Sequence, residues 1–71
     1  MIYYTEHAKD RMRQRGITEE EVEYGLQNYH TCYRDETGNP IYRADLPNGK
    51  HIKIVTAYGK AETTIVTVAD Y

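Results

Sequence analysis

The 71-residue sequence has only one cysteine and no apolar stretch long enough to cross a membrane. A single cysteine, Cys32, excludes an intramolecular disulfide and a cysteine-rich zinc site, and it fits a reducing cytosol. No sequence neighbour activates its thiol, so we expect Cys32 to serve as a small buried apolar side chain. A membrane span requires roughly 18 apolar residues, and residues 1–6 lack the basic and apolar regions of a signal peptide. The sequence therefore predicts a cytoplasmic protein without a membrane partner.

The motifs of several enzyme classes are also missing. There is no P-loop, no GxGxxG and no GxSxG, which argues against nucleotide-cofactor enzymes and serine hydrolases. The three histidines, His7, His30 and His51, follow no metal-ligand spacing. We therefore expect neither a cofactor nor a bound metal.

Charge and length narrow the class of protein further. Nine Lys and Arg stand against eleven Asp and Glu, for a net charge of −2, so a nucleic-acid site must be a local basic patch. The chain is short enough to form one domain, residues 1–71, that buries only about 60% of its unfolded surface, and a homodimer would add stability. All eight aromatic residues are tyrosines, which suit the margin of a small core, a docking interface or a base-stacking platform.

Helix signals occupy the first third of the sequence. Thr5 can cap a helix over residues 6–15 because its hydroxyl accepts a free first-turn amide, and Gly16 supplies the left-handed residue that ends it. A second helix begins at Thr18, where Thr18 and Glu21 have the spacing of a capping box. One face of this second helix is apolar and consists of Val22, Leu26 and Tyr29.

From His30 onward the sequence alternates between strand and turn signals. The expected strands are residues 31–34, 41–46, 51–58 and 62–69. Within the third strand, Ile52 and Ile54 share one face, and His51, Lys53 and Val55 share the other, which is a half-buried pattern. A short edge strand at residues 3–4 is a further option. The predicted fold class is α+β, with two N-terminal helices packed on one face of an antiparallel sheet of three to four strands.

The most informative pattern is a row of three basic residues spaced four apart, His7, Arg11 and Arg15. In a helix they lie at about 0°, 40° and 80°, so they form one stripe beside the apolar face. Stacked like charges cost about 0.2 to 0.5 kcal/mol, which predicts a partner outside the helix. An RNA or another anion would supply phosphate oxygens. The structural alternative is an acid of the same chain, and the candidates are Glu21, Asp45 and Asp70.

A second basic group is expected on the sheet. Arg43 can share a face with His51 and Lys53 of the third strand, and Tyr58 ends that strand. Alternating charge on a solvated strand indicates only solubility when it stands alone. In combination with the helix stripe it meets the needs of a metal-independent ribonuclease, because Arg binds phosphate oxygens and His transfers a proton near neutral pH.

Residues 7–18, with the sequence HAKDRMRQRGIT, resemble the opening H-A-x-x-R-M-x-x-R-G-I-[ST] of a family of small bacterial and phage proteins, a numbered domain of unknown function. The resemblance extends over nearly the whole chain. That family is similar in predicted architecture to the RelE-like endoribonuclease toxins, which have two helices followed by an antiparallel sheet and cut RNA without a metal.

This resemblance implies a RelE-like two-layer fold and a toxin-like, metal-independent endoribonuclease. The positions that match the motif are the implied catalytic residues, His7, Arg11 and Arg15. Strand position adds four expected RNA-binding residues, Arg43, His51, Lys53 and Tyr58. The implied partners are RNA or the ribosome, and a cognate antitoxin. The rival hypothesis is a non-catalytic module, with a homodimer as one option, whose tyrosine-rich sheet docks protein or RNA and whose arginines are structural.

Overall fold

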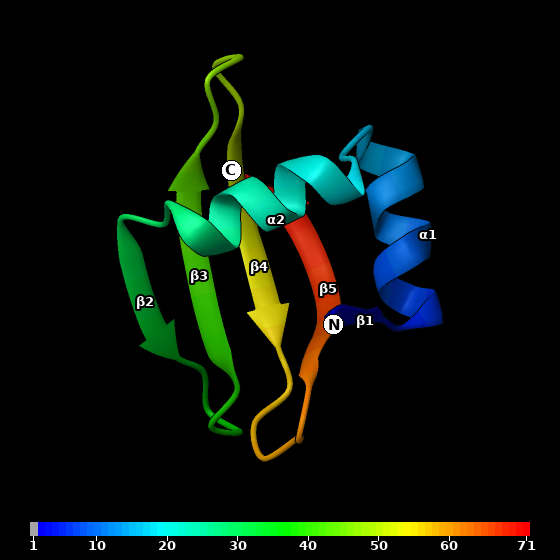
Figure 1. Ribbon diagram of the computed structural model, residues 1–71, viewed down its shortest axis with the longest axis vertical. Coiled ribbons are helices and arrows are strands. Elements are labelled where there is room, and N and C mark those ends of the chain that lie inside the picture. The colour runs from blue at the N-terminus through cyan, green and yellow to red at the C-terminus, as the bar shows by residue number, and fades with distance from the viewer. Residues whose placement is uncertain (1) are drawn as a thin grey trace.

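The computed structural model describes residues 2–71, which form two helices and five strands (Figure 1). In chain order the elements are β1 (Ile2–Tyr4), α1 (Glu6–Arg15), α2 (Glu19–Gln27), β2 (Thr31–Arg34), β3 (Pro40–Asp45), β4 (His51–Thr56) and β5 (Thr63–Asp70). The strands form one sheet in the order β1-β5-β4-β3-β2. No helix within residues 2–71 is long and apolar enough to cross a membrane.

The sheet is mixed and has five strands, more than the three to four antiparallel strands expected. Strands β2 to β5 are antiparallel neighbours as predicted, whereas β1 pairs in parallel with β5. Strand β5 would be the edge of the sheet without β1, and its free side accepts β1 as a neighbour. Just after β1, the Thr5 N–H donates to the Ile65 carbonyl of β5 at 3.1 Å. The α+β fold class, with two helices packed against a sheet, is confirmed.

Strand limits differ from the prediction by one or two residues, except those of β2. Strands β3 and β5 are each displaced by one residue. Strand β4 ends at Thr56 rather than Tyr58, because the Tyr58 N–H donates to Oδ1 of Asn39 at 3.1 Å instead of to a neighbouring strand. The predicted burial of Cys32 is wrong. This residue is exposed because β2 is an edge strand whose four residues are all exposed.

Helix α1 begins and ends at the predicted residues. The Thr5 hydroxyl accepts the N–H of Ala8 at 3.1 Å. At the other end Gly16 has a φ of 67°, a left-handed conformation that glycine adopts without steric cost. The Ile17 N–H then donates to the Met12 carbonyl at 2.9 Å, and both of these side chains are buried. The turn between the helices is therefore closed by hydrogen bonds and by an apolar contact.

Helix α2 has the predicted capping box. The Thr18 hydroxyl accepts the Glu21 N–H at 3.1 Å, and a Glu21 carboxylate oxygen accepts the Thr18 N–H at 2.9 Å. The helix ends at Gln27, so Tyr29 lies beyond it, although the sequence places Tyr29 on the apolar stripe. Its ring instead packs edge-on against Tyr42, with centroids 4.9 Å apart.

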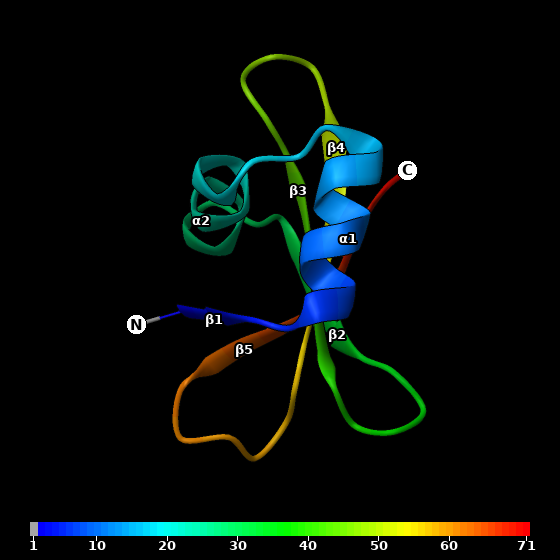
Figure 2. The same cartoon turned by 90° about the vertical axis from the view of Figure 1, so that its right-hand side faces the viewer.

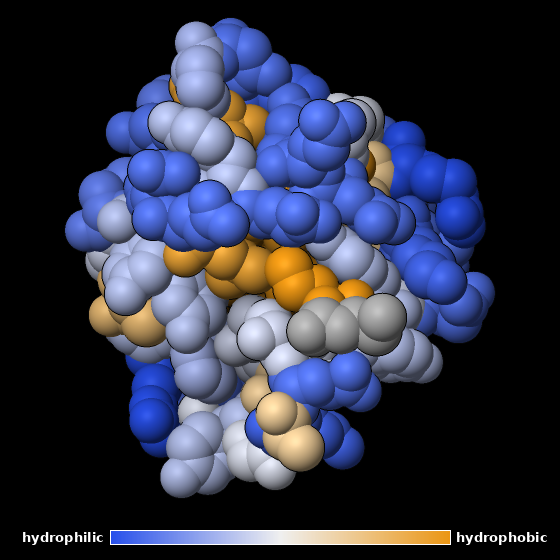
Figure 3. Space-filling model, viewed as in Figure 1, coloured by the Kyte–Doolittle hydropathy of each residue, from blue (hydrophilic) through white to orange (hydrophobic). Residues whose placement is uncertain are grey.

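The core lies between the helices and the sheet. Its largest fully buried side chains are Val22, Ile52, Ile54, Ile65 and Val68. Helix α2 approaches the sheet closely at Gly25, where a Cβ atom would lie 3.0 Å from Cδ1 of Ile54 and 3.1 Å from Cδ1 of Ile52. The missing side chain of Gly25 therefore allows α2 to pack this close to the sheet. Figure 3 shows apolar surface just beneath α2, on the side of the molecule that the helices cover.

The opposite side of the sheet carries no helix within residues 2–71. Figure 2 shows α2 on one side of the sheet and α1 along the edge that β5 and β1 form. We call the uncovered side the open face. Its residues on β3, β4 and β5 are Ile41, Arg43, Asp45, His51, Lys53, Val55, Thr67 and Ala69. All except Ile41 are half-buried or exposed, so a ligand has access to them.

Candidate functional site

Both ends of α1 are attached to the sheet. The hydroxyl of Thr5, which caps the helix, donates to the Val66 carbonyl at 3.1 Å, next to the register irregularity between β4 and β5. At the other end, Arg15 Nη1 lies 2.7 Å from Asp70 Oδ1, and Lys50 Nζ donates to the Gly16 carbonyl at 2.7 Å. These contacts hold α1 alongside β5 in the same direction, and they fix the position of its basic stripe beside the open face.

The stripe and the sheet together form a hollow of about 290 Å³, which we call the basic hollow. Four basic side chains line it: His7, Arg11 and Arg15 from α1, and Lys53 from β4. Its remaining lining residues are Val55, Thr67, Val68 and Ala69. Within the described chain, residues 2–71, no carboxylate lines this hollow. It therefore offers several cations to one ligand.

Within residues 2–71, only one member of the stripe has an acidic partner. Arg15 pairs with Asp70, whereas the side chains of His7, Arg11 and Lys53 take part in no hydrogen bond or ion pair. Of the acids proposed from the sequence as partners, Asp70 serves Arg15, and Asp45 bonds to His51 at 2.6 Å.

The remaining candidate acid, Glu21, is also engaged elsewhere. The Thr18 backbone N–H donates to this carboxylate and lowers the pKa of Glu21, and Asn48 and Lys50 lower it further, against a smaller opposing effect of burial. Pairing with an acid of the same chain therefore accounts for Arg15, but Arg11 has no acidic partner among residues 2–71.

The sheet extends this basic surface past Lys53. In the ladder, Lys53 lies opposite Ala69 on one side and Arg43 on the other. The Arg43 guanidinium carbon lies 3.9 Å from the ring centroid of Tyr71. Its Nε atom is buried and has no hydrogen-bond partner within residues 2–71. Arg43, Lys53 and the α1 stripe therefore form one basic row across the open face.

Two histidines share a carboxylate at one end of the open face. Asp45 Oδ1 lies 2.6 Å from His51 Nδ1 and 3.5 Å from His30 Nε2. His30 Nε2 is also 3.0 Å from the Tyr71 hydroxyl. The hydrogen bond with His51 lowers the pKa of Asp45, and the charges of both histidines lower it further. We call these four residues, His30, Asp45, His51 and Tyr71, the histidine cluster.

Sequence reasoning named only His51 from this cluster as a site residue. The contact of Asp45 with His51 could have been predicted from the sequence, because the hairpin at Asn48 and Gly49 places these two residues directly opposite each other. The contact between His30 and Tyr71 could not be predicted in this way, since His30 precedes the first strand of the hairpins and Tyr71 follows the last strand. Their contact depends on the Tyr71 N–H, which donates to the His51 carbonyl at 3.0 Å and brings Tyr71 over the open face.

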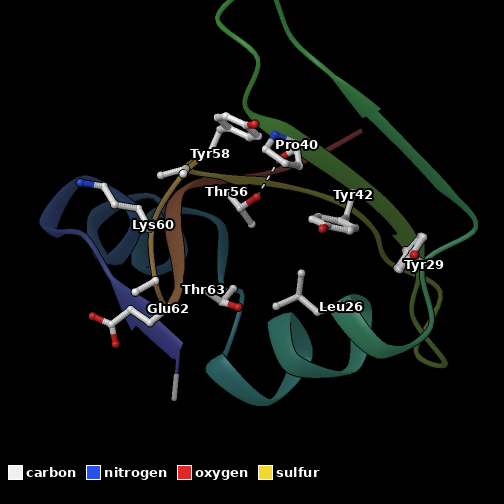
Figure 4. A pocket seen from close by; sticks show the side chains of 12 residues that line it. Leu26, Tyr29, Pro40, Tyr42, Thr56, Tyr58, Lys60, Glu62 and Thr63 are labelled. Atoms are coloured by element: carbon white, nitrogen blue, oxygen red, sulfur yellow. Dashed lines mark hydrogen bonds between the residues drawn. The ribbon is translucent and has the colours of Figure 1, made fainter.

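Another cavity, of about 420 Å³, lies away from these residues. It is on the helix-covered side, between the end of α2 and the β4–β5 turn, and Figure 4 shows Leu26 and Tyr42 directed toward it. Tyr58 lines this cavity, and the guanidinium of Arg34 lies 4.7 Å from its ring centroid. The cavity has neither a histidine nor an arginine in its described lining, so we place the candidate site at the basic hollow rather than here.

A family model described as "Domain of unknown function (DUF4258)" matches residues 4–70. The chain belongs to the DUF4258 family. Neither the curated proteins nor the solved structures include a significant match to it. The matched span of the DUF4258 domain contains the whole basic hollow and every member of the histidine cluster except Tyr71.

In this DUF4258 domain, six of the seven predicted site residues lie on or beside the open face. Four of them line the basic hollow, namely His7, Arg11, Arg15 and Lys53. Arg43 and His51 continue the same surface on β3 and β4. The seventh, Tyr58, lies in the turn after β4 and does not join them.

Proposed function

We propose that this protein is a toxin-like, metal-independent endoribonuclease of RelE-like type that binds single-stranded RNA on its open face. The observation that carries the proposal is the basic hollow, in which four basic side chains and no described carboxylate converge on one space. Arg and Lys are the side chains that bind phosphate oxygens. A magnesium site would instead present oxygen ligands such as carboxylates.

Two cations line the basic hollow without an acidic partner among residues 2–71, Arg11 and Lys53, and they are the proposed phosphate ligands. Both are half-buried, so each side chain is partly ordered by its surroundings while its charge has no partner within residues 2–71. Charge that develops on the phosphate during cleavage is stabilised by donors that are already in place. Arg15 already bonds to Asp70, so its proposed contribution is a charge at the end of the hollow.

RNA cleavage without a metal also needs a group that takes a proton from the ribose 2′-hydroxyl. Histidine is suited to this step because it exchanges a proton near neutral pH. The sequence predicts His7 for this role. Its imidazole is exposed and lines the hollow beside Arg11.

The distribution of charge favours RNA approach from this side. The protein carries a net charge of −2, and the first turn of α2, on the opposite side of the sheet, contains Glu19, Glu20 and Glu21. An acidic back and a basic face orient a polyanion toward the open face. We propose RNA, free or on the ribosome, as the substrate, and a cognate antitoxin as the natural inhibitor.

The test is to induce the wild type and two charge-reversed variants in bacterial cells and to map new RNA 5′ ends across the transcriptome. Arg11→Glu reverses a charge inside the hollow. Arg13→Glu is the matched control, because Arg13 is on the same helix but pairs with Asp10 and lines a different part of the surface. Living cells supply ribosomes, so ribosome-dependent cleavage is also detected.

We expect new ends and growth arrest from the wild type and from Arg13→Glu, and neither from Arg11→Glu, with all three proteins folded. Cleavage that survives Arg11→Glu would reject the role of the hollow. Crosslinking of the wild type to RNA without new ends would indicate an RNA-binding module that does not cut. If neither ends nor crosslinks appear, the tyrosine-rich protein-docking module is the better description.

A further inference from the structure

We infer that His51 is the general base of this reaction, with Asp45 as the residue that positions it. This inference rests on the proposed function. It differs from the motif-based expectation, which assigns proton transfer to His7.

The first step is the orientation of the ring. Asp45 Oδ1 lies 2.6 Å from His51 Nδ1. A carboxylate at this distance accepts the Nδ1 proton, so the neutral imidazole keeps the proton on Nδ1 and leaves the Nε2 lone pair free. No hydrogen bond within residues 2–71 involves that Nε2 atom. His7 has no described carboxylate to select its tautomer.

The second step is the exposure of the cluster. The side chains of His30, Asp45 and His51 are 46%, 60% and 52% exposed. Ion pairs this accessible add little to the stability of a fold. The contacts of Asp45 with the two imidazoles therefore orient these side chains and add little to the stability of the protein. Because the three side chains are exposed, a substrate can reach them.

The third step is the position of the cluster relative to the cations. Asp45 and His51 are paired across β3 and β4, and the next pair on the same face is Arg43 with Lys53. Two residues along a strand span about 7 Å. A phosphate bound by Lys53, one of the two proposed phosphate ligands, thus lies one residue pair away from a ribose placed at His51.

His7 lies at the other end of the face. It is eight residues before Arg15 on α1, a distance of about 12 Å along the helix axis, and Arg15 marks the end near His51 through its bond to Asp70. Arg15, rather than His7, is therefore the member of the stripe that lies at the His51 end of the face. Because His51 has an orienting carboxylate, we assign the proton transfer to it and leave His7 as a phosphate contact.

The chemical step is a transfer within the RNA chain. His51 Nε2 takes the proton of the ribose 2′-hydroxyl, and the 2′-oxygen forms a bond to the adjacent phosphorus. The bond from phosphorus to the 5′-oxygen breaks with its electron pair on that oxygen, which takes a proton from water. The hydroxide left behind takes the proton from the His51 imidazolium. The products are a 2′,3′-cyclic phosphate and a 5′-hydroxyl, and no net water is consumed.

The experiment compares His51→Gln, Asp45→Asn and His7→Gln with the wild type in a bacterial translation extract, which contains ribosomes and messenger RNA. Three quantities are measured for each: the rate at which 5′-hydroxyl ends form, the amount of RNA crosslinked to the protein, and the melting temperature. The first reports chemistry, the second reports binding and the third reports folding.

We expect His51→Gln to lower the cleavage rate by about 10²-fold or more, the usual effect of removing a general base, while crosslinking stays within about twofold of the wild type. Asp45→Asn keeps a carbonyl oxygen at the same place, so we expect a smaller fall in rate, again without loss of crosslinking. His7→Gln should reduce crosslinking and rate together. If Asp45 and His51 had only a structural role, their substitution would change the melting temperature, and the cleavage rate and the amount of crosslinked RNA would fall together.

Cleavage at the wild-type rate by folded His51→Gln would overturn the inference and leave the endoribonuclease proposal standing. If His51→Gln does not fold, the isosteric Asp45→Asn decides the question, since an unchanged rate in that variant also overturns the inference. A wild type that cuts no RNA rejects the proposed function and this inference with it.

Discussion

Replacing Gly25 with alanine tests how closely α2 packs on the sheet. The new Cβ would lie 3.0 Å from Cδ1 of Ile54 and 3.1 Å from Cδ1 of Ile52, whereas contacting carbon atoms prefer about 3.5–4.0 Å. Overpacking a core costs about 1–3 kcal/mol, and alanine is about 1 kcal/mol better than glycine inside a helix. We therefore expect Gly25→Ala to lower the free energy of unfolding by about 1 kcal/mol.

A second substitution isolates this contact. Ile54→Val removes the atom nearest the new methyl group and by itself costs about 1 kcal/mol. In the double variant the alanine methyl gains room, so we expect the loss to be about 1 kcal/mol smaller than the sum of the single losses. Ile65→Val is the matched control, because Ile65 is equally buried but is not among the nearest atoms to Gly25. Its effect should add to that of Gly25→Ala within about 0.5 kcal/mol.

Urea unfolding measures the free energy of unfolding of the three single and two double variants, provided that the m-value stays constant. A domain of this length is stable by roughly 4–10 kcal/mol, so each variant should remain folded. Additive losses for Gly25→Ala and Ile54→Val would refute the reasoning, because they would mean that the two positions do not compete for space. A Gly25→Ala protein stabilised by about 1 kcal/mol would refute it as well, since only the helix preference would then remain.

Three further predictions follow from single contacts. Thr18→Ala removes half of the capping box and should lower the free energy of unfolding by about 1 kcal/mol in urea; no change would mean that water replaces the cap. Carboxyl NMR should find the pKa of Asp45 below its ordinary value, and His51→Gln should raise it. Because the folded-state pKa is depressed, the stability from Asp45 is present above its unfolded pKa of about 3.9 and is lost as the pH falls through the folded value. Arg15→Ala breaks an exposed pair with Asp70 and should cost about 0.2–1 kcal/mol, less in high salt; a loss above about 2 kcal/mol would show a buried role.

Local signals in the sequence predicted the helices closely. The hydrogen bonds that begin and end α1 and begin α2 join residues at most five positions apart, so the residue types at Thr5, Gly16 and Thr18 were enough to locate these three ends. The alternation in β4 likewise predicted that Ile52 and Ile54 face the core, because side chains on a strand alternate between its two faces.

The strand ends, and the parallel pairing of β1, which contains the edge strand expected at residues 3–4, depended on distant residues. β4 stops before Tyr58 because of Asn39, and β1 becomes a strand because β5 offers it an edge. Neither partner is near in the sequence, so no local pattern could report these pairings. Tyr29 shows the same limit, since its place on a helical stripe was overridden by the packing of its ring against Tyr42.

For the candidate site, the sequence by itself determined that His7, Arg11 and Arg15 form one stripe, because helical geometry sets their angular spacing. Only the tertiary structure decided what the stripe faces. The attachment of α1 to β5 at Val66 and Asp70 places the stripe and Lys53 around the same hollow. It also gives Arg15 an acidic partner, whereas Arg11 has none among residues 2–71. The physical reason is that a helix specifies its own faces through local geometry, whereas its partner is set by contacts between segments more than 50 residues apart.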